Sequence, residues 1–431
     1  MSRRVVVNNL SVEMREKIRT DLQIRQEPNK YAFGAQPTFI YPYELVNDDI
    51  YVPFAYNRKF PRPDRETFEK RRYNFVGTLR EPQKEVKTKA ISHLNKYGST
   101  LIACFCGFGK TCCTINIASK IRMVALIIVH RVVLVNQWKE SINKFCPDAT
   151  VQILDANSVM EDCDFYIMNA INIPKNRKSF YKRVGLLIVD EAHLIMAERL
   201  SESMLSFTPR YVVGLSATPY RPDGLNALFK LYFGKRKIER KLWHRHIVYR
   251  VDSGFVPEVE LAKNGKVNWN SVLNSQCNNP DRNEMIVRLV KFFPHRVFLI
   301  LCKRVAQAKY LVARLEEEDE DVTSLIGSQQ HYGHDNRILV GTSSKLGVGF
   351  DHPRLNALIL ASDIEQYFVQ FLGRIFRTER VEPMILDIVD KNPILEKHAR
   401  TRRAVYMEHG GTIKSFSKKF PEFKLCGKNK M

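Results

Sequence analysis

The 431-residue sequence predicts an α/β chain with two open, mostly parallel sheets in tandem and helices on both faces of each sheet. The main observation is an alternation of short apolar runs, free of proline and charge, with amphipathic segments. Such runs are typical of buried parallel strands that alternate with helices. The alternation occupies residues 77–224 and returns over residues 281–395, which predicts two α/β domains.

The expected strands of the first domain are STLIACF, VALIIVH, DFYIMN, LLIV and YVVGLS. Those of the second domain are RVFLILC, RILVGT, ALILAS and PMILDIV. Residues 1–76 are expected to form a small N-terminal accessory domain, because a helical repeat is followed by a segment rich in Pro and Tyr. The irregular, basic residues 225–280 favour a connector, and residues 396–431 a basic C-terminal tail.

The charge of the chain favours a polyanionic partner. Its 68 basic and 46 acidic residues give a formal net charge of +22, which indicates nucleic acid; a generally basic surface is the alternative. We expect no membrane association and no signal peptide, because no apolar run approaches the ~18 residues of a transmembrane helix. Nine cysteines without a CxxC pair favour a reducing, intracellular location, either cytoplasm or nucleus.

A phosphate-binding loop is predicted where the first strand meets a helix. The stretch CFCGFGKT ends in Gly109-Lys110-Thr111, although the usual pattern has a glycine at the position of Cys104. Backbone N–H groups and the helix N-terminus would converge on a triphosphate at such a junction. Gly107 and Gly109 would let the backbone approach, Lys110 would reach the outer phosphates, and Thr111 would bind Mg²⁺. The alternative is an accidental Gly-Lys-Thr in a cysteine-rich core.

A second acidic motif supports the nucleotide interpretation. The strand LLIV runs into Asp190-Glu191-Ala192-His193, and carboxyl ends of parallel strands meet at the edge that holds the loop. Asp190 would hold the shell of Mg²⁺, and Glu191 would orient the attacking water. The two motifs together predict binding of ATP with Mg²⁺.

Four motifs in order resemble motifs I, II, III and VI of superfamily 2 helicases: GFGKT, DEAH, Ser216-Ala217-Thr218 and QFLGRIFR. The resemblance covers about residues 79–390 and implies two tandem RecA-like domains. LREPQ resembles the glutamine motif and VGTSSKLGVGFD resembles motif V. One departure from the family pattern is that the helix expected before motif V is abbreviated to GSQQHYGHDN, where nucleic-acid contacts would otherwise lie.

The resemblance implies the roles of the site residues. Catalytic roles are implied for Lys110, Asp190, Glu191, Gln370, Arg374 and Arg377. Nucleotide contacts are implied for Gln83, Gly107, Gly109, Lys110, Thr111, Gly349 and Asp351. Contacts with nucleic acid, or coupling to it, are implied for His193, Ser216, Thr218 and Thr342. The blander alternatives are a surface glutamine at position 83 and structural ion pairs at the two arginines.

SATPYRPDG and QFLGRIFR resemble XPB-like DNA translocases, and a wider set of motifs is similar to the transcript-release DNA helicase of poxviruses and its relatives in other large DNA viruses. This implies DNA rather than RNA as partner, with RNA polymerase or other transcription proteins, in the host cell or a virion. The alternatives are an RNA helicase, a DNA-dependent ATPase without strand separation, and a basic binding protein with a degenerate ATPase. The intact Lys110, Glu191 and Arg377 argue against the last.

Three lesser signals have competing interpretations. The cysteines around the loop are expected to be small buried hydrophobes. Trp138 is expected in the core rather than stacked on a base. Phe416 and Phe420 lie among lysines near the C-terminus, which suits either contacts with single-stranded nucleic acid or a solvated tail.

Overall fold

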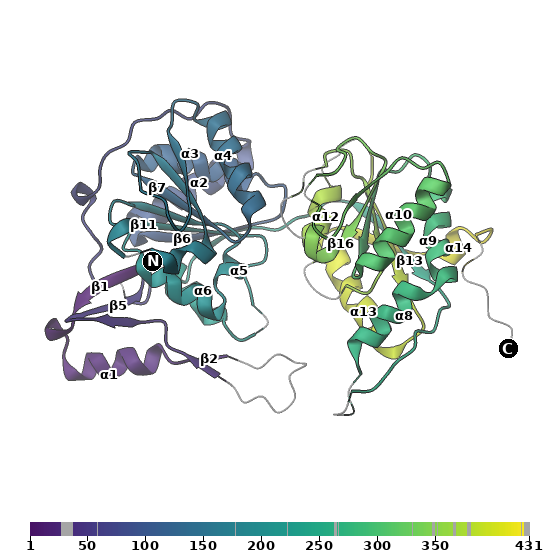
Figure 1. Ribbon diagram of the computed structural model, residues 1–431, viewed down its shortest axis with the longest axis horizontal. Coiled ribbons are helices and arrows are strands. Elements are labelled where there is room, and N and C mark those ends of the chain that lie inside the picture. Colours follow the sequence, from purple (N-terminus) through teal and green to yellow (C-terminus); the bar gives the residue numbers. More distant parts are fainter. Residues whose placement is uncertain are drawn as a thin grey trace. The chain divides into compact units, whose positions relative to one another are not determined.

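The computed structural model describes residues 1–26, 38–57, 59–176, 178–221, 223–262, 265, 267–329, 331–346, 350, 352–364, 368–376, 381–423 and 425 (Figure 1). The chain divides into two compact units, Met1–Arg240 and Lys241–Met431. Each unit contains a seven-stranded parallel sheet. The predicted tandem α/β architecture is therefore confirmed. Within the described ranges, no helix combines the length and the apolar character needed to cross a membrane.

The sheet of the first unit has the strand order β12-β6-β11-β10-β7-β9-β8. Its central strands are buried along their whole length, because helices cover both faces. The strands are β6 (Ser99–Cys104), β7 (Ala125–Val129), β8 (Val151–Leu154), β9 (Phe165–Asn169), β10 (Leu186–Val189), β11 (Tyr211–Ser216) and β12 (Lys237–Arg240). The helices are α2 (Glu81–Tyr97), α3 (Lys110–Ile121), α4 (Val132–Phe145), α5 (Ala192–Ile195), α6 (Glu198–Ser203) and α7 (Asn226–Phe233).

The N-terminal segment belongs to the first unit. It contains β1 (Ser2–Val6), α1 (Val12–Asp21), β2 (Ile24–Gln26), β3 (Thr38–Ile40), β4 (Glu44–Val46) and β5 (Asp49–Pro53). Met1 and Phe54 are fully buried in the core of the first parallel sheet, and the Ser2 N–H donates to the Phe207 carbonyl at 2.6 Å. The small core of the segment itself consists of Val5, Ile18, Leu22, Ile50, Val52 and Phe60. The expected separate accessory domain is thus joined to the first sheet through shared apolar side chains.

The sheet of the second unit has the order β15-β16-β14-β17-β18-β13-β19. Its strands are β13 (His246–Asp252), β14 (Phe298–Cys302), β15 (Val322–Leu325), β16 (Ile338–Thr342), β17 (Ala357–Leu360), β18 (Met384–Val389) and β19 (Gly411–Ser415). The helices are α8 (Trp269–Asn278), α9 (Pro280–Phe292), α10 (Val305–Glu317), α11 (Ser343–Leu346), α12 (Val369–Ile375), α13 (Pro393–Glu408) and α14 (Phe416–Lys419).

Two expected boundaries differ from the structure. Residues 225–280, expected as a connector, contain α7 and β12 of the first unit and β13 and α8 of the second. Residues 396–423, expected as a basic tail, contain most of α13, then β19, which pairs with β13, and α14. Phe416 is fully buried and packs 5.0 Å from Phe420, ring centroid to centroid. The solvated-tail interpretation is wrong for these described residues, because Phe416 lies in the core of the second unit and Phe420 packs against that core. Contact of the neighbouring lysines with nucleic acid stays a prediction.

Candidate nucleotide and nucleic-acid site

The phosphate-binding loop connects β6 to α3, as the sequence predicts. Gly107 and Gly109 have φ angles of 87° and 85°, a region that favours glycine. A Cβ on Gly109 would lie 2.4 Å from Gln83 Nε2, so no other residue fits without displacing Gln83. The loop thus presents bare backbone at the N-terminus of α3, where N–H groups and the helix dipole attract anions.

The ammonium group of Lys110 is hydrogen-bonded to the backbone of the loop. Lys110 Nζ donates to the carbonyl oxygens of Cys104, at 2.9 Å, and Phe105, at 3.3 Å. Thr111 follows in the first turn of α3 and is half-buried. Cys104 is fully buried, and burial raises the pKa of its thiol to about 11. The core thus accommodates a side chain at the position of the usual glycine, while the Cys104 carbonyl contacts Lys110. The expectation of buried cysteines holds for Cys104, Cys106 and Cys113, whereas Cys112 is only half-buried.

Gln83 braces the same loop from α2. Its Nε2 donates to the Phe108 carbonyl at 2.9 Å, and its Oε1 accepts from the Arg80 N–H at 2.9 Å. Arg80 also donates from Nη2 to the Phe108 carbonyl at 2.6 Å. Gln83 is 5% exposed, which excludes the surface-glutamine alternative. The sequence did not indicate the contribution of Arg80, because a long side chain beside a loop has no pattern of its own.

Asp190 lies at the carboxyl end of β10 with both carboxylate oxygens occupied. Oδ1 accepts from the Glu191 N–H at 2.9 Å, and Oδ2 accepts from Trp138 Nε1 at 2.8 Å. Burial and the charge of Glu191 raise the pKa of the Asp190 carboxyl, whereas the Trp138 hydrogen bond and the charge of Lys110 act in the opposite direction. The indole thus fixes the orientation of this carboxylate and favours its ionised form.

Trp138 is, after Arg80, a second residue in contact with the site that the sequence reasoning missed. It lies on α4 and is 1% exposed, so the expected core position is correct. A buried indole N–H generally needs a hydrogen-bond acceptor, and this requirement alone could have indicated that Trp138 has a polar partner. The sequence could not show which carboxylate accepts the hydrogen bond of the indole N–H. Trp138 follows β7 and Asp190 follows β10, and the two residues are brought together by the parallel pairing of these strands.

Glu191 and His193 turn away from the strand in a strained arrangement. Glu191 has φ 45° and ψ 51°, the left-handed region, which costs about 1–2 kcal/mol for a residue with a Cβ. Its Oε2 lies 3.4 Å from His193 Nδ1. Burial and the charges of Arg221 and Lys110 lower the pKa of His193 to about 4, so the imidazole is neutral near pH 7.

His193 connects the acidic motif to the end of β11. Its Nδ1 lies 3.0 Å from Ser216 Oγ, which also accepts from the Thr218 N–H at 3.1 Å. All three side chains are buried. The arrangement follows from the parallel pairing of β10 with β11, in which Val189 lies opposite Gly214. Three of the four residues expected to couple the site to nucleic acid therefore form one contiguous group that begins three residues after Asp190.

The second unit holds the remaining described site residues. Thr342 ends β16, is 5% exposed, and accepts from Ser344 Oγ at 3.3 Å. Gln370 and Arg374 lie on α12, where Gln370 is 6% exposed. The Arg374 guanidinium lies 4.7 Å from the centre of the Phe350 ring. The predictions for Gly349, Asp351 and Arg377 lie outside the described residues.

The donor set in the first unit fits a hard divalent cation. Mg²⁺ is usually held by one or two protein oxygens together with substrate phosphates and water. Asp190 offers a fixed carboxylate, and Thr111 a hydroxyl at the helix N-terminus that faces an anion-binding loop. These residues would hold Mg²⁺, which would neutralise charge on the phosphates when bound.

Comparisons with known proteins agree with this geometry. Residues 77–221 match the family "Type III restriction enzyme, res subunit". The chain is 42% identical to "Putative helicase 161L" of Invertebrate iridescent virus 6, over 96% of this chain and all of that protein. It is 33% identical to "Putative helicase 055L" of Frog virus 3, over 84% of this chain and 86% of that protein. It is 24% identical to "Putative ATP-dependent RNA helicase L396" of Acanthamoeba polyphaga mimivirus, over 95% and 84% respectively.

The fold also resembles a solved structure. "S. cerevisiae Dbp5 bound to RNA and ADP BeF3" superposes with a TM-score of 0.56, covering 78% of this chain and 91% of that one at 14% identity. This likeness confirms that the two sheets are tandem RecA-like domains.

Proposed function

We propose that this chain, which belongs to the superfamily 2 helicases of large DNA viruses, couples ATP hydrolysis to movement along DNA. The observation that supports the proposal is the connected set of contacts in the first unit. The phosphate loop, the Asp190–Trp138 pair and the His193–Ser216–Thr218 group lie at one edge of the sheet. A nucleotide bound at the loop would thus be connected to residues expected to respond to nucleic acid.

The residues have the following proposed roles in hydrolysis. Lys110 binds the outer phosphates, Thr111 and Asp190 hold Mg²⁺, and Glu191 orients a water against the γ-phosphorus. The water oxygen forms a bond to the γ-phosphorus, and the bond from the γ-phosphorus to the bridging oxygen breaks. ADP leaves with that oxygen, inorganic phosphate is the other product, and the water proton passes to Glu191 or solvent.

Other roles rest on the motif resemblance. Arg374 and Arg377, with Gln370, would stabilise the charge of the transition state, an effect worth ~10³–10⁵ in rate in related chemistry. Gln83 would recognise the adenine while it braces the loop. The remaining contacts are assigned to Gly349 and Asp351 for the nucleotide and Thr342 for nucleic acid.

DNA is favoured over RNA by SATPYRPDG and by QFLGRIFR, in place of the QRAGRAGR of RNA-directed relatives. The RNA helicase alternative has support from relatives in mimivirus and African swine fever virus, which are named putative ATP-dependent RNA helicases. The two differ in a measurable way, because B-form DNA and A-form RNA space their phosphates differently and only RNA has a 2′-hydroxyl.

The test is ATPase activity with duplex DNA, single-stranded DNA and RNA at matched length and salt. We expect greater stimulation by DNA. Equal stimulation by DNA and RNA would agree with an ATP-dependent motor but contradict the preference for DNA. Stronger stimulation by RNA would establish the RNA helicase alternative. An intact enzyme that no nucleic acid stimulates would overturn the motor itself. A strand-separation assay on the same substrates distinguishes a helicase from a translocating ATPase.

We further propose a role in viral transcription, with RNA polymerase or other transcription proteins as partners, on the resemblance to the poxvirus transcript-release helicase. This role would place the protein in the host cytoplasm or nucleus, or in the virion. The test is ATP-dependent release of a nascent transcript from a stalled elongation complex of the virus. An elongation complex that keeps its transcript with active enzyme present would contradict the role.

A further inference from the structure

The edge of the first sheet opposite the phosphate loop is rich in arginine from β12 to β7. Because the strands are parallel and in register, the residues that precede them meet at this one edge. The residues shortly before β7, β10, β11 and β12 include Arg122, Arg183, Arg210 and Arg236. From β12 to β7 the sheet crosses four strand spacings of ~4.8 Å, roughly 19 Å in all. The edge is therefore long enough to contact several successive phosphates.

An extended segment adds further cations beside β7. Lys70 pairs with Met123 in an antiparallel bridge, and the Arg71 N–H donates to the Arg122 carbonyl at 3.2 Å. In extended backbone, alternate side chains point to opposite sides. Arg71 is accordingly buried, whereas Lys70 and Arg72 are both exposed. The segment thus presents two cations to solvent next to Arg122, which is also exposed.

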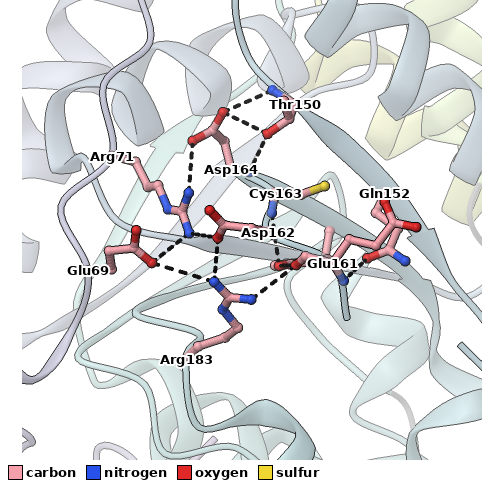
Figure 2. A network of polar contacts seen from close by, with 10 residues as sticks. Glu69, Arg71, Thr150, Gln152, Glu161, Asp162, Cys163, Asp164 and Arg183 are labelled. Carbon is pink, nitrogen blue, oxygen red and sulfur yellow. Dashed lines mark hydrogen bonds and ion pairs between the residues drawn. The ribbon is translucent and has the colours of Figure 1, made fainter. Parts of the chain in front are cut away.

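Figure 2 shows what anchors this segment. The inward guanidinium of Arg71 contacts Glu69 at 2.7 Å and also bonds to Asp162, which accepts in turn from Arg183 at 2.5 Å. Asp164, 3.9 Å from Arg71, also accepts from the Thr150 N–H at 2.9 Å. The acidic residues of this network are therefore committed to Arg71 and Arg183, and the network fixes the segment to the start of β9.

Two adjoining cavities lie against the exposed cations. One of about 350 Å³ is lined by Lys70, Arg72, Tyr73, Asn74 and Arg122. The other, of about 230 Å³, is lined by Arg65, Glu66, Phe68, Lys70, Arg122 and Met123. Both share Lys70 and Arg122, so they form one groove, and we call Arg65, Lys70, Arg72 and Arg122 the basic groove. Within the described part of the chain, Lys70, Arg72 and Arg122 make no ion pair.

We propose that the basic groove is a second contact for the phosphate backbone of nucleic acid, on the edge of the first sheet away from the ATP loop. The proposal rests on the proposed function only in taking nucleic acid as the partner. Four cations against one carboxylate, Glu66, match a polyanion, and arginine forks bind phosphate in bidentate geometry. At the other end of the edge, Lys235 and Arg236 line a further cavity of about 290 Å³, which extends the row.

An acidic protein segment is the rival occupant, and the lining of the groove favours phosphates. Protein partners generally insert aromatic or aliphatic anchors into apolar pockets. The apolar and aromatic side chains of the groove, Phe68, Tyr73 and Met123, are themselves buried. The surface available to a partner is therefore mainly cationic and polar, which suits contacts that position a backbone without reading its sequence.

The test compares two triple variants of the full chain. The groove variant is Lys70→Gln, Arg72→Gln and Arg122→Asn; Asn is chosen because Arg122 has a φ of 57° that Asn tolerates. The control variant, with the same loss of charge at exposed helix positions, is Lys17→Gln, Lys89→Gln and Lys139→Gln. Duplex DNA, single-stranded DNA and polyglutamate serve as probes, and affinity is titrated against salt.

We expect the groove variant to keep the basal ATPase activity and to bind duplex DNA ~10- to 100-fold more weakly at moderate salt, with a slope of log K against log salt shallower by about 3. The control variant should keep both affinity and slope near wild type. If the DNA affinity and salt dependence of the groove variant match those of the control while nucleic acid still stimulates the wild-type ATPase, the role of the basic groove is contradicted and the proposed motor function is not. If nucleic acid does not stimulate the ATPase of the wild-type protein, the proposed function itself is contradicted. Loss of polyglutamate binding with intact DNA binding would assign the groove to an acidic protein.

A second measurement needs no variant. Acetylation of wild-type lysines, mapped by mass spectrometry, should show Lys70 protected by bound DNA and Lys17 modified at the same rate with or without it. Full reactivity of Lys70 at saturating DNA would overturn the proposal.

Discussion

Trp138→Phe isolates one hydrogen bond of the nucleotide site. The substitution keeps an aromatic ring in the core and removes the Nε1 donor that lies 2.8 Å from Asp190 Oδ2. A hydrogen bond to a buried charged group contributes about 1.5–3 kcal/mol. Without it the carboxylate keeps only the hydrogen bond from the Glu191 N–H and is less constrained to the orientation in which it would hold Mg²⁺. A loss of that size corresponds to ~10- to 150-fold in an equilibrium or rate.

The assay is steady-state ATP hydrolysis titrated with both MgATP and free Mg²⁺. We expect catalytic efficiency to fall by ~10- to 150-fold, and the Mg²⁺ concentration for half-maximal activity to rise. Trp243→Phe is the matched control, because that indole is 70% exposed and lies in the second unit. It removes the same atoms without touching a carboxylate of the site.

Thermal unfolding separates this role from simple packing. A smaller ring leaves space in the core, so Trp138→Phe should lower the melting temperature by a few degrees for each kcal/mol lost. If the melting temperature falls while catalytic efficiency and Mg²⁺ dependence stay at wild-type values, Trp138 only fills the core. That result would refute the reasoning that the indole positions Asp190.

Four further substitutions test the remaining assignments. Lys110→Ala should abolish hydrolysis and weaken ATP binding in an equilibrium titration, since the loop loses its cation; near-normal turnover would contradict the loop assignment. Glu191→Gln should keep ATP binding and stop hydrolysis, so that the protein stalls on nucleic acid, and a collapse of ATP affinity would make Glu191 structural. Arg374→Ala should lower kcat by ~10³-fold or more with ATP affinity unchanged in the absence of nucleic acid; the reverse pattern would count against a transition-state role. Phe416→Ala should destabilise the second unit by about 3–5 kcal/mol in denaturant unfolding, because its ring is fully buried; an unchanged midpoint would restore the tail interpretation.

The fold could be predicted where strands are buried on both faces. Runs such as LLIV and ALIIV form β10 and β7, in which every residue is buried. The same reasoning fails for strands with a different pattern. In β12 only Ile238 is buried, and β19 reads GTIKS with no buried residue. Pairing with β6 and β13 makes these segments strands, and pairing is not visible in local sequence.

One interior strand could not be predicted from the sequence because it contains charged residues. β13 lies between β18 and β19 and contains Arg250 and Asp252, so it breaks the rule that buried parallel strands lack charge. The two side chains form an ion pair with each other at 2.7 Å. Their positions are two residues apart and therefore on the same face of the strand. Both side chains reach solvent, with 38% and 54% of their surfaces exposed, so this strand is not buried along its whole length and its charges need no compensation in the core. Segments of this kind are therefore mistaken for a connector.

The residues of the candidate site could be predicted from the sequence more fully than the contacts between them. Asp190 and Ser216 are far apart in sequence, yet Asp190 follows β10 and Ser216 ends the neighbouring β11. The register of these parallel strands sets Val189 opposite Gly214. That register brings His193 within 3.0 Å of Ser216, and burial keeps the imidazole neutral, so the contact requires no counter-charge. We expect a displacement of the Asp190 turn to shift Thr218, because His193 and Ser216, which lie between them, are buried and in hydrogen-bonding contact. The path from the nucleotide to the end of β11 is therefore a property of strand register, which motif spacing alone could not supply.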